Sequence, residues 1–322
     1  MAEVRYMERC LDLAAMAWPS CRPNPMVGAV LVKDEKILGE GYTQAFGSAH
    51  AEVMALRNVQ EKDLSQATLY VSLEPCAHHG KTPPCVDLIM EKGIGKVIIA
   101  TRDPFPEVDG KGIEILREKG VTVEVGLMEK EARFQNRRFF TFHEKKRPYV
   151  ILKWARTKDD FIDSAQEQHA SLKISSAVSS QYVHRWRAEE MAILVGGETY
   201  RKDKPSLDTR LANGPDPRPI IWSKTLKEKD LQEKHQGKAS IISADSVEGL
   251  LAELYDAGIQ SLLVEGGAKV LQAFLKSGHY DEVRRITAEM EIGQGVQGPS
   301  WLDVSSTRYH VGADILDWEI RS

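Results

Sequence analysis

Hydrophobic and polar positions alternate along the first 125 residues in the way typical of helices and strands that follow one another. A helical stripe of apolar residues begins at Tyr6 and stops near Pro19, because proline cannot continue a helix. Two strand-like runs, residues 27–32 and 37–42, are separated by four charged residues that indicate a hairpin. The pattern further predicts a helix over residues 51–58 and strands over residues 67–73, 96–100 and 121–125. This order predicts a single sheet with helices on both of its faces.

The second half of the chain repeats this alternation after an interruption. Residues 143–149 form a charged run that contains Pro148, and a new strand is predicted over residues 150–155. We therefore expect two α/β domains, residues 1–146 and residues 147–322. In the second domain the pattern predicts strands over residues 192–195, 219–222, 239–242 and 261–264, and helices over residues 176–189, 246–257 and 267–276.

Composition agrees with two hydrophobic cores and excludes several classes of function. The 322 residues are 42% hydrophobic and 28% charged, as in ordinary globular proteins. A net charge of −4 argues against nucleic acid as a partner. No apolar run reaches the length of about 18 residues that spans a membrane, and no signal peptide is evident at the N-terminus. We expect a cytoplasmic protein that binds neither nucleic acid nor membrane.

Two short motifs predict a zinc site. The first is His50-Ala51-Glu52, and the second is Pro75-Cys76, with eight residues between Cys76 and Cys85. One His and two Cys are zinc ligands that leave a fourth position for water, and bound zinc lowers the pKa of that water to about 7. Glu52 lies two residues after the His and is the expected proton shuttle, so the set is typical of base deaminases. The alternative is a chance His-x-Glu and two unrelated buried thiols. It explains the His-x-Glu motif and the cysteines separately, but it does not explain why they occur together.

The residues around the zinc motif also resemble a known family. Residues 74–85 (Glu-Pro-Cys-Ala-His-His-Gly-Lys-Thr-Pro-Pro-Cys) are similar to the bifunctional riboflavin-biosynthesis proteins, as are residues 22–30 and 39–42. Nucleoside and tRNA deaminases instead carry Pro-Cys-x-x-Cys. The resemblance implies a cytidine-deaminase-like α/β/α layer followed by a dihydrofolate-reductase-like α/β domain that uses NADPH. It also implies deamination of 2,5-diamino-6-ribosylamino-4(3H)-pyrimidinone 5′-phosphate, and then hydride transfer to C1′ that converts the ribosyl group to ribityl.

The resemblance assigns roles to individual residues. Asn24 is expected to face the pyrimidine, and His78, His79 and Lys81 either approach the substrate or serve as loop scaffolding. The expected substrate residues of the reductase are Lys153, Ser171, Arg187, Leu207, Arg210 and Glu265. The expected cofactor residues are Ala155, Thr199, Asp203, Gly267, Ala268, Lys269, Val270, Leu271, Gln272 and Ala273.

The reductase half departs from the family pattern, and this leaves other interpretations open. Asp160 stands at a turn position that the family fills with Gly, and Lys173 stands where it often has Trp. Without the resemblance, the two glycines after Glu265 indicate only a strand–helix turn. One alternative is therefore a working deaminase with a non-catalytic C-terminal binding or dimerisation domain. A second is an editing deaminase whose C-terminal domain binds RNA, but that predicts Cys-x-x-Cys spacing and a basic surface. A homodimer is compatible with the family resemblance.

Overall fold

The chain folds into two compact units, Met1–Lys145 and Lys146–Ser322. The structure is a computed structural model that describes residues 2–77, 83–164, 172–302 and 305–321. The boundary expected from the sequence, after residue 146, lies one residue further along the chain than this division. In the described residues no helix is both long and apolar enough to cross a membrane.

The N-terminal unit is a five-stranded sheet with helices on both faces. The strands lie in the order β2-β1-β3-β4-β5, where β1 is antiparallel to both of its neighbours and β3, β4 and β5 are parallel. The elements are α1 (Ala2–Ala15), β1 (Gly28–Lys33), β2 (Lys36–Tyr42), α2 (Ala51–Leu56), β3 (Thr68–Val71), α3 (Cys85–Glu91), β4 (Lys96–Ile99), α4 (Lys111–Glu118), β5 (Thr122–Val125), α5 (Glu129–Gln135) and α6 (Arg137–Lys145).

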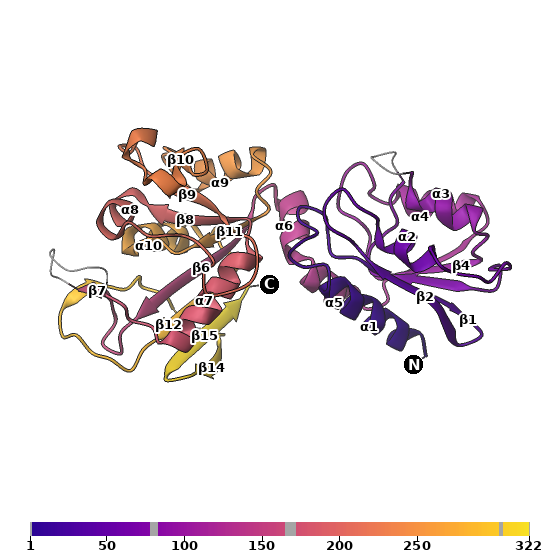
Figure 1. The fold of residues 1–322 in the computed structure, drawn as a ribbon, viewed down its shortest axis with the longest axis horizontal. Helices are drawn as coiled ribbons and strands as arrows, with labels where there is room; N and C mark the ends of the chain where they lie inside the picture. Colours follow the sequence, from indigo (N-terminus) through magenta and orange to yellow (C-terminus); the bar gives the residue numbers. More distant parts are fainter. Residues whose placement is uncertain (1, 78–82, 165–171, 303–304, 322) are drawn as a thin grey trace. The chain divides into compact units, whose positions relative to one another are not determined.

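Alternation along the strands produces the two cores of this unit. Leu69 and Val97 belong to the core on one face, whereas their neighbours Tyr70 and Ile98 belong to the core on the other. The first core includes residues of α2, α3 and α4, and the second includes residues of α1 and α5. Figure 1 shows these two groups of helices on opposite sides of the sheet. The predicted hairpin, sheet and covering helices are therefore present.

The C-terminal unit is built on an eight-stranded sheet in the order β10-β9-β8-β11-β6-β12-β15-β14. The first six strands are parallel, and β15 and β14 are antiparallel additions at one edge. The elements are β6 (Tyr149–Arg156), β7 (Phe161–Ser164), α7 (Ala177–Glu189), β8 (Ala192–Gly196), α8 (Gly197–Asp203), β9 (Arg218–Trp222), the 3-10 helices η1 (Glu228–Asp230) and η2 (Glu233–His235), β10 (Ser240–Ile242), α9 (Val247–Asp256), β11 (Ser261–Val264), α10 (Ala268–Ser277), β12 (Glu282–Thr287), β13 (Gly295–Gln297), β14 (Thr307–Val311) and β15 (Asp314–Ile320).

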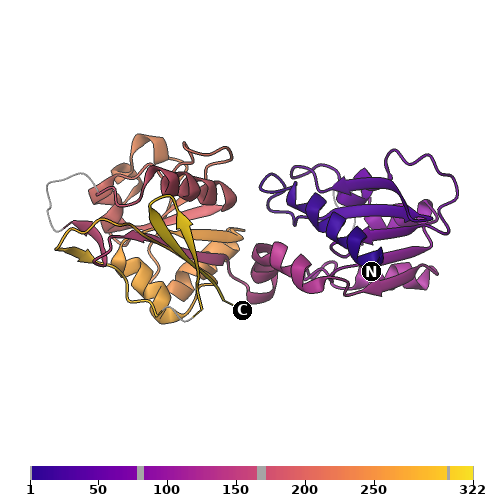
Figure 2. The same ribbon diagram turned by 90° about the horizontal axis from the view of Figure 1, so that it is seen from below.

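Helices cover both faces of this larger sheet. Trp186 and Val183 of α7 pack against one face, and Leu250, Leu254 and Phe274 of α9 and α10 pack against the other. Figure 2 shows the pink α7 and the orange α9 and α10 on opposite sides of the strands. In open parallel sheets, ligands bind outside the carboxyl ends of the strands. Strands β8, β11 and β6 are neighbours here, so the residues that follow them meet at one edge.

Candidate active sites

The three predicted zinc ligands come together in the N-terminal unit. His50 is the residue before α2, Cys76 follows β3, and Cys85 is the first residue of α3. Helix α2 reaches its position because it packs closely on β2. A Cβ atom added at Gly41 would lie 2.4 Å from the carbonyl oxygen of Ala51, so this position of the strand requires glycine.

The geometry of these ligands fits a single zinc ion. The Nδ1 atom of His50 lies 3.5 Å from the Sγ atom of Cys76 and 3.3 Å from that of Cys85. Tetrahedral coordination with ordinary Zn–N and Zn–S bonds separates N and S by about 3.5 Å. The backbone N–H of Cys85 also donates to Cys76 Sγ at 3.3 Å. The sulfur–nitrogen distances and the donor set are therefore those of a three-ligand zinc site.

Glu52 lies beside this site on the first turn of α2 and is only 4% exposed. Burial, together with the nearby charge of Cys76, raises the pKa of its carboxyl group to about 7. Burial is the larger of the two causes. A carboxyl group with such a pKa can both accept and donate a proton near neutral pH, which a proton shuttle requires.

The carboxylate of Glu74 fixes the turn that carries Cys76. One of its oxygens accepts N–H bonds from Asp103 (3.2 Å) and Gly110 (3.0 Å), and the other accepts them from Gly112 (3.0 Å) and Ile113 (3.3 Å). Three of these donors lie at the N-terminus of α4, where a carboxylate is favourable. This role of Glu74 was not predicted from the sequence. Its position directly before Pro75-Cys76 was the available signal, but its partners lie 29–39 residues away.

In the C-terminal unit, Lys153, Arg187 and Glu265 form a buried ion-pair cluster. The Nε and Nη2 atoms of Arg187 donate to the two oxygens of Glu265 at 2.8 and 2.9 Å. The Nζ atom of Lys153 lies 3.5 Å from Glu265 Oε2. Burial favours the neutral acid, but the charges of Arg187 and Lys153 outweigh it and hold the pKa of Glu265 at about 2. Three of the predicted substrate residues are thus brought together from β6, α7 and the end of β11.

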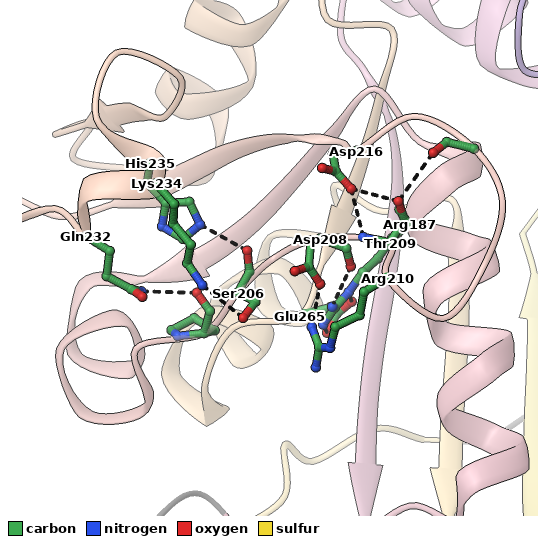
Figure 3. Close-up of polar contacts among 12 residues, drawn as sticks. Arg187, Ser206, Asp208, Thr209, Arg210, Asp216, Gln232, Lys234, His235 and Glu265 are labelled. Atoms are coloured by element: carbon green, nitrogen blue, oxygen red, sulfur yellow. Dashed lines mark hydrogen bonds and ion pairs between the residues drawn. The ribbon is translucent and has the colours of Figure 1, made fainter.

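Two more predicted substrate residues lie on the segment that follows α8. The Nη1 atom of Arg187 donates to the backbone oxygen of Asp208 at 3.0 Å, which ties this segment to the cluster. Arg210 is exposed and forms an ion pair with the Asp208 carboxylate (Figure 3). Leu207 is 2% exposed and has a φ of +54°, which is uncommon for a bulky residue.

The expected cofactor residues Thr199 and Gly267 lie where two strand–helix turns meet, and Asp203 is the last residue of α8. A Cβ atom at Gly266 would lie 2.5 Å from the Cα atom of Val195, and one at Gly267 would lie 2.6 Å from Thr199 Oγ1. The β11–α10 turn can therefore approach the β8–α8 turn because residue 266 is glycine, whereas a Cβ atom at residue 267 would displace only the Thr199 hydroxyl. Among the described residues, Asp203 Oδ1 is a buried atom without a hydrogen-bond partner. The N-termini of α8 and α10 suit a dinucleotide phosphate, and the unpartnered carboxylate oxygen of Asp203, at the other end of α8, suits a sugar hydroxyl.

The other residues predicted from the sequence differ in their exposure and in whether the structure describes them. Leu271 is 1% exposed, so contact with a cofactor could come only from its backbone, and Ala273 is half-buried against the same core. Asn24 is half-buried on the loop before β1, and Lys173 is exposed. Asp160 has a φ of +71°, so the expected left-handed turn is present with Asp in the place of Gly. Of the other predicted cofactor residues, Ala155 lies near the end of β6, and Ala268, Lys269, Val270 and Gln272 lie on α10. Ser171, His78, His79 and Lys81 lie outside the described residues.

Comparison with known proteins defines the class of the chain. The family model described as the cytidine and deoxycytidylate deaminase zinc-binding region matches residues 2–101. The family model described as the RibD C-terminal domain matches residues 148–308. The chain is therefore a two-domain enzyme in which a zinc-binding deaminase domain precedes a reductase domain.

Relatives that span nearly the whole chain identify the family. A riboflavin biosynthesis protein RibD from Aquifex aeolicus is 39% identical, over 90% of this chain and 88% of that protein. The RibD protein of Bacillus amyloliquefaciens is 37% identical, over 92% of this chain and 87% of that protein. A crystal structure from Thermotoga maritima has a TM-score of 0.85 and 35% identity, and it covers 100% of this chain and 99% of that one. The chain belongs to the RibD family of riboflavin-biosynthesis proteins.

This assignment confirms the expectations about class. The α/β fold, the deaminase and reductase activities, and the cofactors Zn²⁺ and NADPH are those of the family. The non-catalytic C-terminal domain considered above is not favoured, because the reductase domain model matches most of that unit.

Proposed function

We propose that this enzyme carries out two consecutive steps of riboflavin synthesis on one phosphorylated pyrimidine. The N-terminal unit would remove the 2-amino group of 2,5-diamino-6-ribosylamino-4(3H)-pyrimidinone 5′-phosphate, and the C-terminal unit would reduce the ribosyl group to ribityl. The observation that carries this proposal is the convergence of His50, Cys76 and Cys85 beside the buried Glu52. The structural relative from Thermotoga maritima is described as a diaminohydroxyphosphoribosylaminopyrimidine deaminase and 5-amino-6-(5-phosphoribosylamino)uracil reductase, which supports the choice of substrate.

In the deaminase unit, His50, Cys76 and Cys85 hold the zinc and Glu52 moves the protons. Bound zinc supplies a water with a pKa near 7, and bound NADPH in the other unit supplies the hydride that reduces C1′ of the sugar. Glu52 takes a proton from the attacking water at a carboxylate oxygen. It then returns this proton to the ring nitrogen or to the departing amine, so that ammonia rather than an amide ion leaves. Asn24 would orient the pyrimidine ring.

In the reductase unit, Lys153, Arg187 and Glu265 orient the sugar and Arg210 binds its phosphate. The three buried groups together carry one net positive charge, which favours a phosphorylated substrate. Arg187 uses three of its five N–H groups on Glu265 and Asp208, which leaves two for a ligand. Ser171 and the backbone of Leu207, whose side chain is 2% exposed, complete the proposed substrate contacts. The proposed cofactor contacts are Ala155, Thr199, Asp203 and the backbone of residues 267–273.

Two wider features belong to the same proposal. The enzyme would work in the cytoplasm on a small-molecule substrate, and it would form a homodimer. Light scattering on the purified protein would measure its mass in solution, and a value near 36.1 kDa, the mass of one chain, would contradict the dimer.

One assay tests the proposed reaction. Protein of measured zinc content is given the diamino-pyrimidine phosphate and NADPH, and ammonia release and NADPH oxidation are followed together. We expect stoichiometric ammonia, followed by NADPH loss. Glu52→Gln should abolish ammonia release while zinc content stays unchanged, because Glu52 is not a ligand.

Two other outcomes would each refute one half of the proposal. Zinc-replete protein that releases no ammonia would refute the proposed deamination. Ammonia release without NADPH oxidation, even with the deaminated compound as substrate, would refute the proposed reduction and return the C-terminal unit to the non-catalytic alternative.

A further inference from the structure

The segment from Asp203 to Arg210 carries three of the proposed reductase residues but has no regular secondary structure beyond the end of α8. Its conformation is also unusual, because Lys204 and Leu207 both have positive φ values, +42° and +54°. Non-glycine residues stay in this region only when their surroundings hold them there. Contacts from other elements must therefore maintain the position of Leu207 and Arg210.

Arg187 and Asp216 hold one side of this segment. Arg187 donates to the backbone oxygen of Asp208, as described above. The backbone N–H and the hydroxyl of Thr209 both donate to Asp216 Oδ1, at 2.8 and 2.7 Å. Figure 3 shows these contacts gathered on one side of the segment.

The other side is held by η2 and the residue before it. The Nε2 atom of Gln232 donates to the Pro205 backbone oxygen at 3.2 Å, and Lys234 Nζ donates to Ser206 Oγ at 2.9 Å. The Nε2 atom of His235 lies 3.0 Å from the backbone oxygen of Ser206. In Figure 3, Gln232, Lys234 and His235 lie together on the side of Ser206 away from Arg187.

Tyr200 connects this group to helix α8. Its hydroxyl lies 2.8 Å from His235 Nδ1 and accepts the backbone N–H of Gln232 at 3.0 Å. A carbonyl oxygen can only accept, so His235 carries its proton on Nε2 and the Tyr200 hydroxyl donates to Nδ1. Every polar atom in this chain of bonds then has a partner. Tyr200 is 2% exposed and His235 is 4% exposed, and satisfied buried networks of this kind fix one arrangement.

We propose that Tyr200 and His235 are positioning residues for the reduction, which act through the Ser206 carbonyl to present Leu207 and Arg210 to the substrate. This inference rests on the proposed function, which places those two residues in the substrate site. Tyr200 lies on α8 between the proposed cofactor residues Thr199 and Asp203. The same hydroxyl therefore links the cofactor helix to the substrate segment.

The test uses the full-length, zinc-loaded enzyme, four single variants, and the double variant Tyr200→Phe/His235→Leu. Tyr200→Phe removes one hydroxyl and leaves the ring, and His235→Leu removes both ring nitrogens. His235→Gln retains a donor for the Ser206 oxygen. The matched control is Tyr149→Phe, because Tyr149 is also a buried tyrosine of this unit, and its hydroxyl bonds Glu282 at 2.9 Å. For each protein we would measure the thermal midpoint, ammonia release, and kcat and KM of NADPH oxidation with the deaminated substrate.

We expect Tyr200→Phe and His235→Leu each to raise KM for the deaminated substrate about tenfold, since the substrate groups are displaced. Ammonia release should not change. The double variant should be no worse than either single one, because both act through one chain of bonds. His235→Gln should recover part of the loss, and Tyr149→Phe should leave KM unchanged.

Two results would overturn the inference. If Tyr200→Phe and Tyr149→Phe had equal KM values at similar thermal midpoints, Tyr200 would have no effect on the substrate site beyond that of any buried tyrosine in this unit. Additive effects in the double variant would show that the two residues do not act as a unit. Failure of the proposed function is separate, because it would show as a wild-type enzyme that releases ammonia but does not oxidise NADPH.

Discussion

Among single residues, Glu74 joins the segment before Cys76 to distant parts of the N-terminal unit. Its carboxylate accepts four backbone N–H bonds and is 3% exposed. In Glu74→Gln the amide nitrogen would face two N–H donors that it cannot accept from. We expect this variant to lose about 2–4 kcal/mol of unfolding free energy and to release zinc more readily to a chelator. Urea unfolding and chelator competition would measure both, with Glu118→Gln on the exposed end of α4 as control. If both variants had the same unfolding free energy and lost zinc at the same chelator concentration, the hydrogen bonds of Glu74 would not be what holds this turn.

Glu265 gives a prediction about pH. Its pKa is about 2 in the folded protein, against an ordinary value of 4.5, because Arg187 and Lys153 outweigh the effect of burial. A lowered pKa stabilises the fold at pH values above 4.5, and this contribution is lost as the pH falls toward 2. The stability advantage of the wild type over Glu265→Gln should therefore shrink by about 2 kcal/mol between pH 6 and pH 3. Urea unfolding at both values would measure it, and an advantage independent of pH would refute the ion-pair assignment.

The sequence predicts the residues of the proposed zinc site better than it predicts the contacts of Glu74 and Glu265. The proposed zinc ligands and Glu52 lie in short motifs whose residue types and spacing predict the chemistry. The contacts of Glu74 and of Glu265 join residues 29–39 and 78 positions apart, and no local pattern encodes them. The family resemblance named Lys153, Arg187 and Glu265 as substrate residues, but only the structure shows that they pair with one another.

At the scale of elements, the contact between the β11–α10 and β8–α8 turns depends on Gly266. A Cβ atom there would lie 2.5 Å from the backbone of β8, which cannot move aside as a side chain can. We expect Gly266→Ala to cost about 1–3 kcal/mol of unfolding free energy and to weaken NADPH binding at least about tenfold. Fluorescence titration with NADPH and urea unfolding would test this.

The matched control is Gly249→Ala in α9. A Cβ atom at Gly249 would have no neighbour closer than 3.6 Å, and alanine is the better helix former. This variant should bind NADPH normally and be at least as stable as the wild type. Similar losses in the two variants would mean that the close approach of the turns is not the cause.

Local patterning accounts for most of the elements and fails at the last strands. The hairpin of β1 and β2 and the strands β8 to β11 are apolar runs bounded by turn residues, so their sequence predicts them. Strand β12 reads Glu-Val-Arg-Arg-Ile-Thr and resembles a charged surface segment, yet Glu282 and Arg284 are 0% and 1% exposed. The guanidinium of Arg284 lies 4.8 Å from the rings of both Trp186 and Trp318. Its partners are distant in sequence, so the pattern alone could not show that this strand is buried.

At the scale of the whole molecule, each unit has its own hydrophobic cores and its own proposed site. Each activity can therefore be removed without unfolding the other unit. Glu52→Gln should stop ammonia release but still oxidise NADPH when the deaminated compound is supplied. Arg210→Ala changes an exposed side chain, so we expect normal ammonia release and reduction slowed about tenfold to hundredfold, by loss of the proposed charged contact with the substrate phosphate.

Mixing these two variants tests whether the intermediate must stay on one chain. Given the diamino substrate, neither variant alone should oxidise NADPH at the wild-type rate. If the intermediate leaves the enzyme, the Arg210→Ala protein supplies it and the Glu52→Gln protein reduces it, so the mixture recovers NADPH oxidation after a lag. The lag should shorten as the concentration of the Glu52→Gln protein rises, because capture of a free intermediate depends on enzyme concentration. A mixture that oxidises NADPH no faster than Arg210→Ala alone, with ammonia release limited to about one equivalent per enzyme before that slow phase, would show that the intermediate stays on the chain that formed it.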